Sequence, residues 1–116
     1  MRYIFLIYND ESKSPPPSEM EGVSAAYQAV TDEMRSSGAF LAGDALQASA
    51  TATVVREGNG SSPLTTDGPY AETKEQLGGF YILECANLDE AVDWAAKIPA
   101  VARGGAVEVR PILELG

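Results

Sequence analysis

The chain has 116 residues, with 8 Lys and Arg against 17 Asp and Glu, a formal net charge of −9, no His and one Cys. That length predicts a single domain, residues 1–116, with a sizeable core, and so acidic a chain should repel phosphate backbones, which argues against nucleic-acid binding. The absence of His and of a second Cys excludes an internal disulfide, the common zinc sites, His-ligated haem and any mechanism with imidazole as the base, so we expect no metal and no cofactor.

Residues 2–8 are predicted to form the first strand. Their apolar side chains occupy both faces, with Tyr3, Phe5 and Ile7 on one and Ile4, Leu6 and Tyr8 on the other. That pattern is typical of a strand that is buried on both sides. The segment is too short and too aromatic for a signal peptide, and no apolar run reaches the length of a membrane span. We therefore expect a cytoplasmic protein that does not enter a membrane.

A helix is predicted after the stiff loop Pro15-Pro16-Pro17. Ser18 and Glu21 make a capping-box pattern at its start, and Gly38 is expected to end it. One apolar stripe recurs along this helix at spacings of three and four residues, formed by Met20, Val23, Tyr27, Val30 and Met34.

The middle of the chain is predicted to form strands. Residues 40–46 and 51–56 are the second and third strands, the latter rich in Thr and Val. Residues 58–62 form a turn, so that residues 64–66 are expected to pair back as a short hairpin arm. After a charged loop, a strand covers residues 79–85.

The last third of the chain predicts one helix and one strand. Asn87 and Glu90 indicate a capped helix over residues 88–98, and Pro99 begins an irregular or short helical piece. Residues 107–113 close the chain as a strand, in which Pro111 indicates an edge or a bulge. The side of the helix expected to face the core carries Ala91, Trp94, Ala95 and Ile98.

The order β-α-β-β-(β)-β-α-β predicts a ferredoxin-like α+β sandwich, an antiparallel sheet with its two main helices on one face. Two helices cover only one face of such a sheet, whereas residues 2–8 are apolar on both. The other face therefore needs a partner, and we expect a homodimer.

One motif in the charged loop is longer and more specific than any other in the chain. It reads Asp67-Gly68-Pro69-Tyr70-Ala71-Glu72-Thr73-Lys74-Glu75, and it leads into the apolar residues 78–83. The string resembles the motif of the DGPF-domain proteins, a branch of the YCII-related family, with Tyr70 where Phe is usual. The resemblance extends over residues 2–112.

This resemblance implies a dimeric α/β barrel, in which two sheets pair through their uncovered faces. It also implies association with an extracytoplasmic-function sigma factor, since DGPF proteins are often found with such factors. In the wider family a His–Asp pair is a suggested mechanism. Because this chain has no His, that mechanism does not carry over.

Asp67 and Lys74 are the catalytic candidates within the motif. Asp67 before Gly-Pro is typical of an Asx-turn, which is a structural role. Alternatively the rigid corner directs its carboxylate toward a pocket as a base or polar anchor. Glu72, Lys74 and Glu75 are either a solvated surface or the lining of a cleft, where a lysine would bind an anionic group or act as a base.

Three further charged residues are candidates for substrate binding or for structural roles. Asp44 lies in a strand pattern, where Asp is disfavoured, and is placed either at a sheet edge or in the pocket. Glu108 and Arg110 share one face of the last strand. They form a surface pair or contact the other subunit, or else Arg110 clamps a carboxylate or enolate. The candidates for substrate binding are thus Asp44, Glu72 and Arg110.

These residues and the resemblance together leave two functions open. The first is a metal-free and cofactor-free enzyme of lyase, isomerase or hydrolase type that acts on an unknown small molecule in a carboxylate-lined pocket between subunits. This hypothesis depends on analogy with related dimeric barrels. The alternative is a non-catalytic regulatory or binding module associated with a sigma factor.

Overall fold

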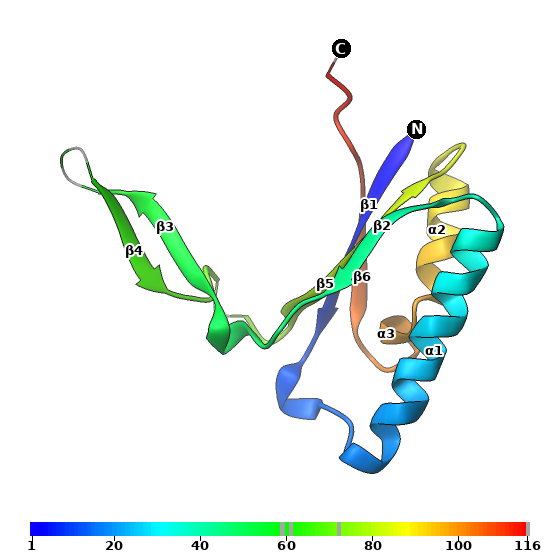
Figure 1. Cartoon of the computed structure of the whole chain (residues 1–116), viewed down its shortest axis with the longest axis horizontal. Helices are drawn as coiled ribbons and strands as arrows, with labels where there is room; N and C mark the ends of the chain where they lie inside the picture. Colours follow the sequence, from blue (N-terminus) through cyan, green and yellow to red (C-terminus); the bar gives the residue numbers. More distant parts are fainter. Residues whose placement is uncertain (59, 61, 72, 116) are drawn as a thin grey trace.

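The chain forms a four-stranded antiparallel sheet and a separate two-stranded hairpin, in a computed structural model that describes residues 1–58, 60, 62–71 and 73–115 (Figure 1). The strand order of the main sheet is β2-β5-β1-β6. These strands are β1 (Arg2–Asn9), β2 (Phe40–Ala45), β5 (Gln76–Glu84) and β6 (Ala106–Pro111). The order confirms the ferredoxin-like α+β fold predicted from the sequence. It places β6 at an edge, which explains why the sheet tolerates Pro111.

The helices lie on one side of this sheet, as predicted (Figure 1). They are α1 (Pro17–Ser36), α2 (Leu88–Lys97) and the short α3 (Pro99–Ala102). Two single 3-10 turns, η1 (Glu11–Lys13) and η2 (Ser49–Thr51), stand in the loops after β1 and β2. Among the described residues, no helix combines the length and apolar character that crossing a membrane requires.

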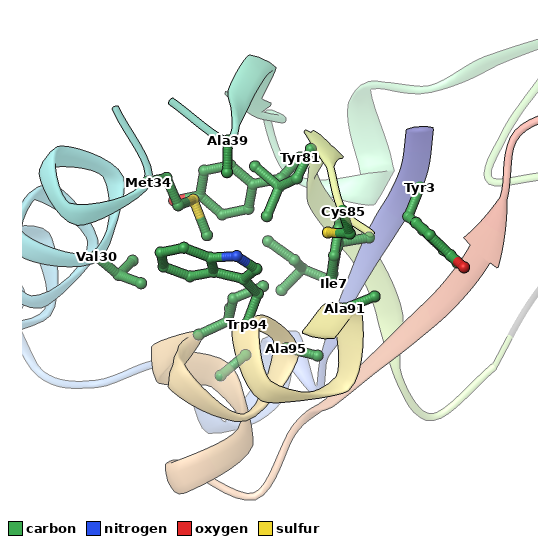
Figure 2. Close-up of a cluster of buried hydrophobic side chains, with 14 residues drawn as sticks. Tyr3, Ile7, Val30, Met34, Ala39, Tyr81, Cys85, Ala91, Trp94 and Ala95 are labelled. Carbon is green, nitrogen blue, oxygen red and sulfur yellow. The ribbon is translucent and has the colours of Figure 1, made fainter. Parts of the chain in front are cut away.

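The core lies between the sheet and the helices. Alternate residues of β1 and β5 point into it, and Figure 2 shows the Trp94 indole among side chains from both helices and the sheet. Cys85 is 2% exposed, and its burial raises the thiol pKa above the usual value. Cys85 therefore acts as a small buried hydrophobe. The core consists of Tyr3, Phe5, Ile7, Val30, Met34, Ala39, Tyr81, Leu83, Cys85, Ala91, Trp94, Ala95, Ile98 and Ala100.

The start of α1 differs from the prediction, whereas its end agrees. The capping box of Ser18 and Glu21 is wrong, because the helix begins at Pro17 and no side chain caps it. A proline fits this first position since its missing N–H would have no helical partner there. At the other end Gly38 has φ +83°, and the N–H of Ala39 donates to the Met34 carbonyl at 3.0 Å. This is the Schellman geometry that terminates helices at glycine.

The apolar stripe of α1 is buried only toward its C-terminal end. Val30 and Met34 are buried and Tyr27 is half-buried, but Met20 is 47% exposed. The N-terminal turns of α1 therefore contribute little to the core.

The capping pattern of α2 is confirmed. The Glu90 N–H donates to Asn87 Oδ1 at 2.9 Å, and the Glu90 carboxylate accepts from the Ala86 N–H at 2.9 Å. The first bond satisfies a donor that the first helical turn leaves free, and the second ties the residue before the N-cap to that turn.

The predicted hairpin is present, and it stands apart from the main sheet. Strands β3 (Thr53–Glu57) and β4 (Pro63–Asp67) pair only with each other; we call this hairpin the arm. The predicted turn at 58–62 lies partly outside the described residues, at positions 59 and 61. At the base of the arm the Gly68 N–H donates to the Ala52 carbonyl at 2.7 Å, so the two ends of the arm are adjacent.

The sheet face opposite the helices is apolar at its centre, and we call it the open face. Side chains from the two central strands lie there in two cross-strand pairs, Leu6 with Phe80 and Ile4 with Ile82. All four are half-buried within the single chain. The two-sided apolar character predicted for the first strand is therefore real, and no helix covers its second side.

Candidate functional site

A cavity of about 320 Å³ lies between α1 and the β2–β5 side of the sheet, on the helix-covered face. This volume is at the lower end of the range for small-molecule pockets. The cavity is lined by Ile7, Asn9, Tyr27, Thr31, Arg35, Phe40, Gly43, Asp44, Ala45, Gly78, Gly79, Phe80 and Tyr81. Its walls thus combine aromatic and aliphatic surface with hydroxyl, amide and guanidinium groups.

Two glycines, one in β2 and one in β5, make room for the cavity and its central tyrosine. A Cβ on Gly43 would lie 2.6 Å from Tyr81 Cδ1 and 3.1 Å from the Phe80 carbonyl oxygen, so the ring of Tyr81 lies directly against Gly43. Gly79 approaches the Asp44 backbone equally closely, where a Cβ would lie 2.9 Å from the carbonyl oxygen. Small residues at these positions therefore shape the floor of the cavity.

The Tyr81 hydroxyl and the Thr31 hydroxyl lie 2.8 Å apart. Thr31 Oγ1 also donates to the Tyr27 carbonyl at 2.8 Å. Because a threonine hydroxyl has a single proton, Tyr81 must be the donor in the first bond. The lone pairs of the Tyr81 oxygen remain able to accept a hydrogen bond from a ligand.

The cavity also has a cationic wall. The Arg35 guanidinium lies 4.7 Å from the centroid of the Phe40 ring, which holds it by a cation–π contact. Arg35 takes part in none of the ion pairs among the residues that the structure describes. Nearby, burial raises the pKa of Tyr27 above its usual value, which keeps this phenol protonated and neutral at physiological pH. The site therefore offers one positive charge and neutral hydroxyls.

The end of the cavity at Asn9 is tied to two loops. The Glu11 N–H donates to Gln76 Oε1 at 3.0 Å, and the Glu11 carboxylate accepts from the Ser49 N–H at 2.9 Å. The hydroxyl of Ser12 holds the pKa of the Asp10 carboxyl below its usual range, and the charge of Lys74 contributes to this effect. Lys13 contributes more than Lys74 to this lowering, and Lys74 has the smallest influence.

Asp44 and Arg110 lie on the open face rather than among the polar groups of the cavity. Asp44 pairs across the sheet with Phe80, and the neighbouring Gly43 faces Tyr81, so alternation directs the Asp44 side chain to the open face. Asp44 lines the cavity through its backbone. Arg110 pairs with Ile4 on the same open face and forms an ion pair with Glu108 at 3.3 Å.

The charged motif is exposed in the protomer. Asp67 is the last residue of β4, and its carboxylate has no hydrogen bond among the described residues. The expected Asx-turn is therefore not found there, since the Gly68 N–H binds Ala52 instead. Lys74 is also exposed, and Glu72 lies outside the described residues. Neither Asp67 nor Lys74 lines the cavity.

The sequence alone did not indicate Thr31, Arg35 or Tyr81 as site residues. Tyr81 stands in an apolar strand, where it has the appearance of a core residue, and Thr31 and Arg35 lie on a helix separated from it by about fifty positions in sequence. Only the register of β2 on β5 and the placement of α1 bring them together. Within the described ranges, no group of three or more Cys, Asp or Glu side chains is placed to hold a metal ion.

Comparisons with known proteins agree with the architecture. The family model of the YCII-related domain matches residues 1–116. An uncharacterized protein of Rhizobium meliloti (strain 1021) is 40% identical over 115 residues, which cover 97% of this chain and 92% of that protein. The solved structure of a 5-chloro-2-hydroxyhydroquinone dehydrochlorinase from Burkholderia phenoliruptrix AC1100, in complex with 2,5-dihydroxybenzoquinone, matches with a TM-score of 0.53. That match covers 97% of this chain and 94% of the other at 16% identity, so it concerns the fold.

Proposed function

Because the chain belongs to the YCII-related family, we propose that it binds and converts a small organic molecule in the cavity between α1 and the β2–β5 side of the sheet. The observation that carries the proposal is the hydroxyl pair of Thr31 and Tyr81 in a cavity that the Arg35 guanidinium also lines, among aromatic and aliphatic side chains. A few convergent polar groups on apolar walls are typical of a ligand site. The dehydrochlorinase of similar fold also acts on a small molecule, a hydroxyhydroquinone.

The available side chains favour proton-transfer chemistry of lyase, isomerase or hydrolase type. Arg35 would bind an anionic or phenolate oxygen through its fork of donors. Tyr81 would exchange a proton with the bound molecule, with Thr31 fixing the orientation of its hydroxyl. An aromatic ring bearing hydroxyl groups fits the aromatic walls and these polar groups.

Replacing Gly43 by Ala is expected to abolish ligand binding in this cavity. The added methyl group would overlap Tyr81 Cδ1, so the ring must move and break its bond to Thr31. The measurement is titration of 2,5-dihydroxybenzoquinone by isothermal calorimetry, with wild type expected to bind and Gly43→Ala to lose at least tenfold in affinity.

Gly22 provides the matched control for that substitution. A Cβ on Gly22 meets no atom within 4 Å, so Gly22→Ala adds the same methyl group on α1 without contact. It should bind as wild type does and gain helix stability, by about 1 kcal/mol at most. Unchanged binding by a folded Gly43→Ala variant would contradict the assignment of the cavity.

We also propose that Asp67 and Lys74 act on the ligand from the loop that leads into β5. This loop reaches Gln76, which pairs with the cavity residue Asn9, and the charge of Lys74 reaches Asp10. Loops held by a rigid scaffold are where reactive groups concentrate. Asp44 and Arg110, on the open face, would contact a ligand bound between two subunits and not one in this cavity, and Glu72 remains a candidate for substrate binding.

The substitution Asp67→Asn tests this part of the proposal. It removes the charge and keeps the size, so activity or ligand affinity should fall. The free energy of unfolding should change by less than about 0.5 kcal/mol, because the carboxylate is exposed and unbonded among the described residues. Denaturant titration gives the stability of the same preparation. Lost stability with unchanged ligand binding would show that Asp67 has an architectural role only.

We further propose that the chain works as a cytoplasmic homodimer through its open face. The half-buried Ile4, Leu6, Phe80 and Ile82 form the continuous apolar surface that such pairing needs. A reducing compartment suits a chain whose one cysteine is a buried free thiol. No feature of the described surface favours a sigma factor as partner.

A further inference from the structure

We propose that the arm, strands β3 and β4, is a clasp that packs against a second copy of this chain. This inference goes beyond the cavity and rests on the proposed homodimer. The arm leaves the main sheet after β2 and returns before β5. It extends on the side of the sheet away from the helices (Figure 1). The arm and the open face therefore border the same space, the one that a second subunit would occupy.

Within one protomer the arm is unsupported. Every described residue of its two strands is exposed except Val54, which is only half-buried. The radius of gyration is 16.3 Å, whereas a compact chain of this length has about 13 Å. A two-stranded hairpin with no other packing is marginally stable in water. A partner surface would supply the missing contacts.

The side chains of the arm suit an apolar contact. Val55 is 62% exposed and Leu64 is 51% exposed, and the register places them on opposite faces of the hairpin. The Arg56 guanidinium of β3 lies 4.7 Å from the centroid of the Tyr70 ring, and that ring is itself 72% exposed. Both outer strand edges also present unpaired backbone groups that another strand can bind.

The area of the open face indicates why the clasp is needed. The four strands have 6, 9, 8 and 6 residues, which gives a projected area of about 470 Å², before the relief of the side chains is counted, at a spacing of about 4.8 Å and a rise of about 3.4 Å per residue. A stable interface buries about 800 Å² on each partner. Reciprocal arms from two identical subunits would add a second contact on each, which favours a second copy over an unrelated partner.

The test removes the arm and measures dimerisation by sedimentation equilibrium. Because the Gly68 N–H already donates to the Ala52 carbonyl, two glycines in place of residues 53–67 close this junction as a β-turn. The dimer dissociation constant is expected to rise at least tenfold. A second variant, Val55→Thr with Leu64→Thr, keeps strand propensity and should raise it at least threefold. Its matched control is Val92→Thr with Leu88→Thr on the exposed face of α2, which should dimerise as wild type does.

The dimer dissociation constants of these variants either support the clasp or overturn it. If the shortened chain folds and dimerises as tightly as wild type, or if the double arm variant does, the clasp is overturned. Should the shortened chain not fold, the double arm variant alone decides. Wild-type protein that is monomeric at micromolar concentration would overturn the clasp and the homodimer together. If both arm variants dimerise as tightly as wild type while Ile82→Glu still dissociates the dimer, the clasp alone is overturned.

Discussion

Replacing Ile82 by Glu is expected to dissociate the proposed homodimer. Ile82 is central on the open face, with Ile4 on one side and Ala42 on the other, and Arg2 on the same face is already paired with Glu114. Burying an unpaired charge at an interface costs several kcal/mol. The dissociation constant should rise about 1,000-fold or more, which corresponds to about 4 kcal/mol. Sedimentation equilibrium over a range of micromolar concentrations measures this shift.

The fold of the single chain should survive this change. Ile82 is only half-buried within the protomer, so its replacement leaves the helix-covered core intact. Val92→Glu is the matched control, because Val92 is 50% exposed on α2 and outside the open face. It should leave the dimer unchanged. An Ile82→Glu protein that dimerises as wild type does would show that the open face is not the interface.

The second large effect is expected from Leu83→Ala in the core. Leu83 has no exposed surface and lies on a central strand, opposite Tyr3 on one side and Phe40 on the other. Truncating a fully buried leucine costs about 3–5 kcal/mol, through lost burial and through the cavity left behind. Guanidinium unfolding at a fixed protein concentration should show this loss, and the melting temperature should fall by about 10 °C or more.

Leu113→Ala is the control for that measurement. Leu113 is 79% exposed beyond the end of β6, so the same truncation should change the free energy of unfolding by less than about 0.5 kcal/mol. Equal destabilisation by both variants would contradict the placement of Leu83 at the centre of the core.

The candidate site shows which site residues local sequence patterns can identify and which they cannot. The sequence placed charged residues near one another along the chain, as in the motif around Asp67 and Lys74. The cavity instead depends on Thr31 of α1 and Tyr81 of β5, which meet only when the helix packs over the sheet. No local pattern marks such a pair, because an isolated Thr or Tyr has the same appearance in a core as in a binding site. Gly43 was visible in the sequence, but its role depends on which ring lies against it.

Secondary structure and fold class were determined by the sequence itself. Apolar residues at every second position predict strands, and apolar residues at every third or fourth position predict helices. These patterns, like the Asn87 cap and the Gly38 terminator, depend on residues that are neighbours in the sequence, so they can be recognised without the fold. The predicted start of α1 is wrong because serine and proline both fit a helix start, and Pro17 at the first helical position makes Pro16 the N-cap, two residues before Ser18. Only the tertiary structure decided which side of the sheet each residue faces. It sends Asp44 to the open face, encloses the cavity on the other side and leaves the arm without support, because register and helix placement depend on contacts between distant segments.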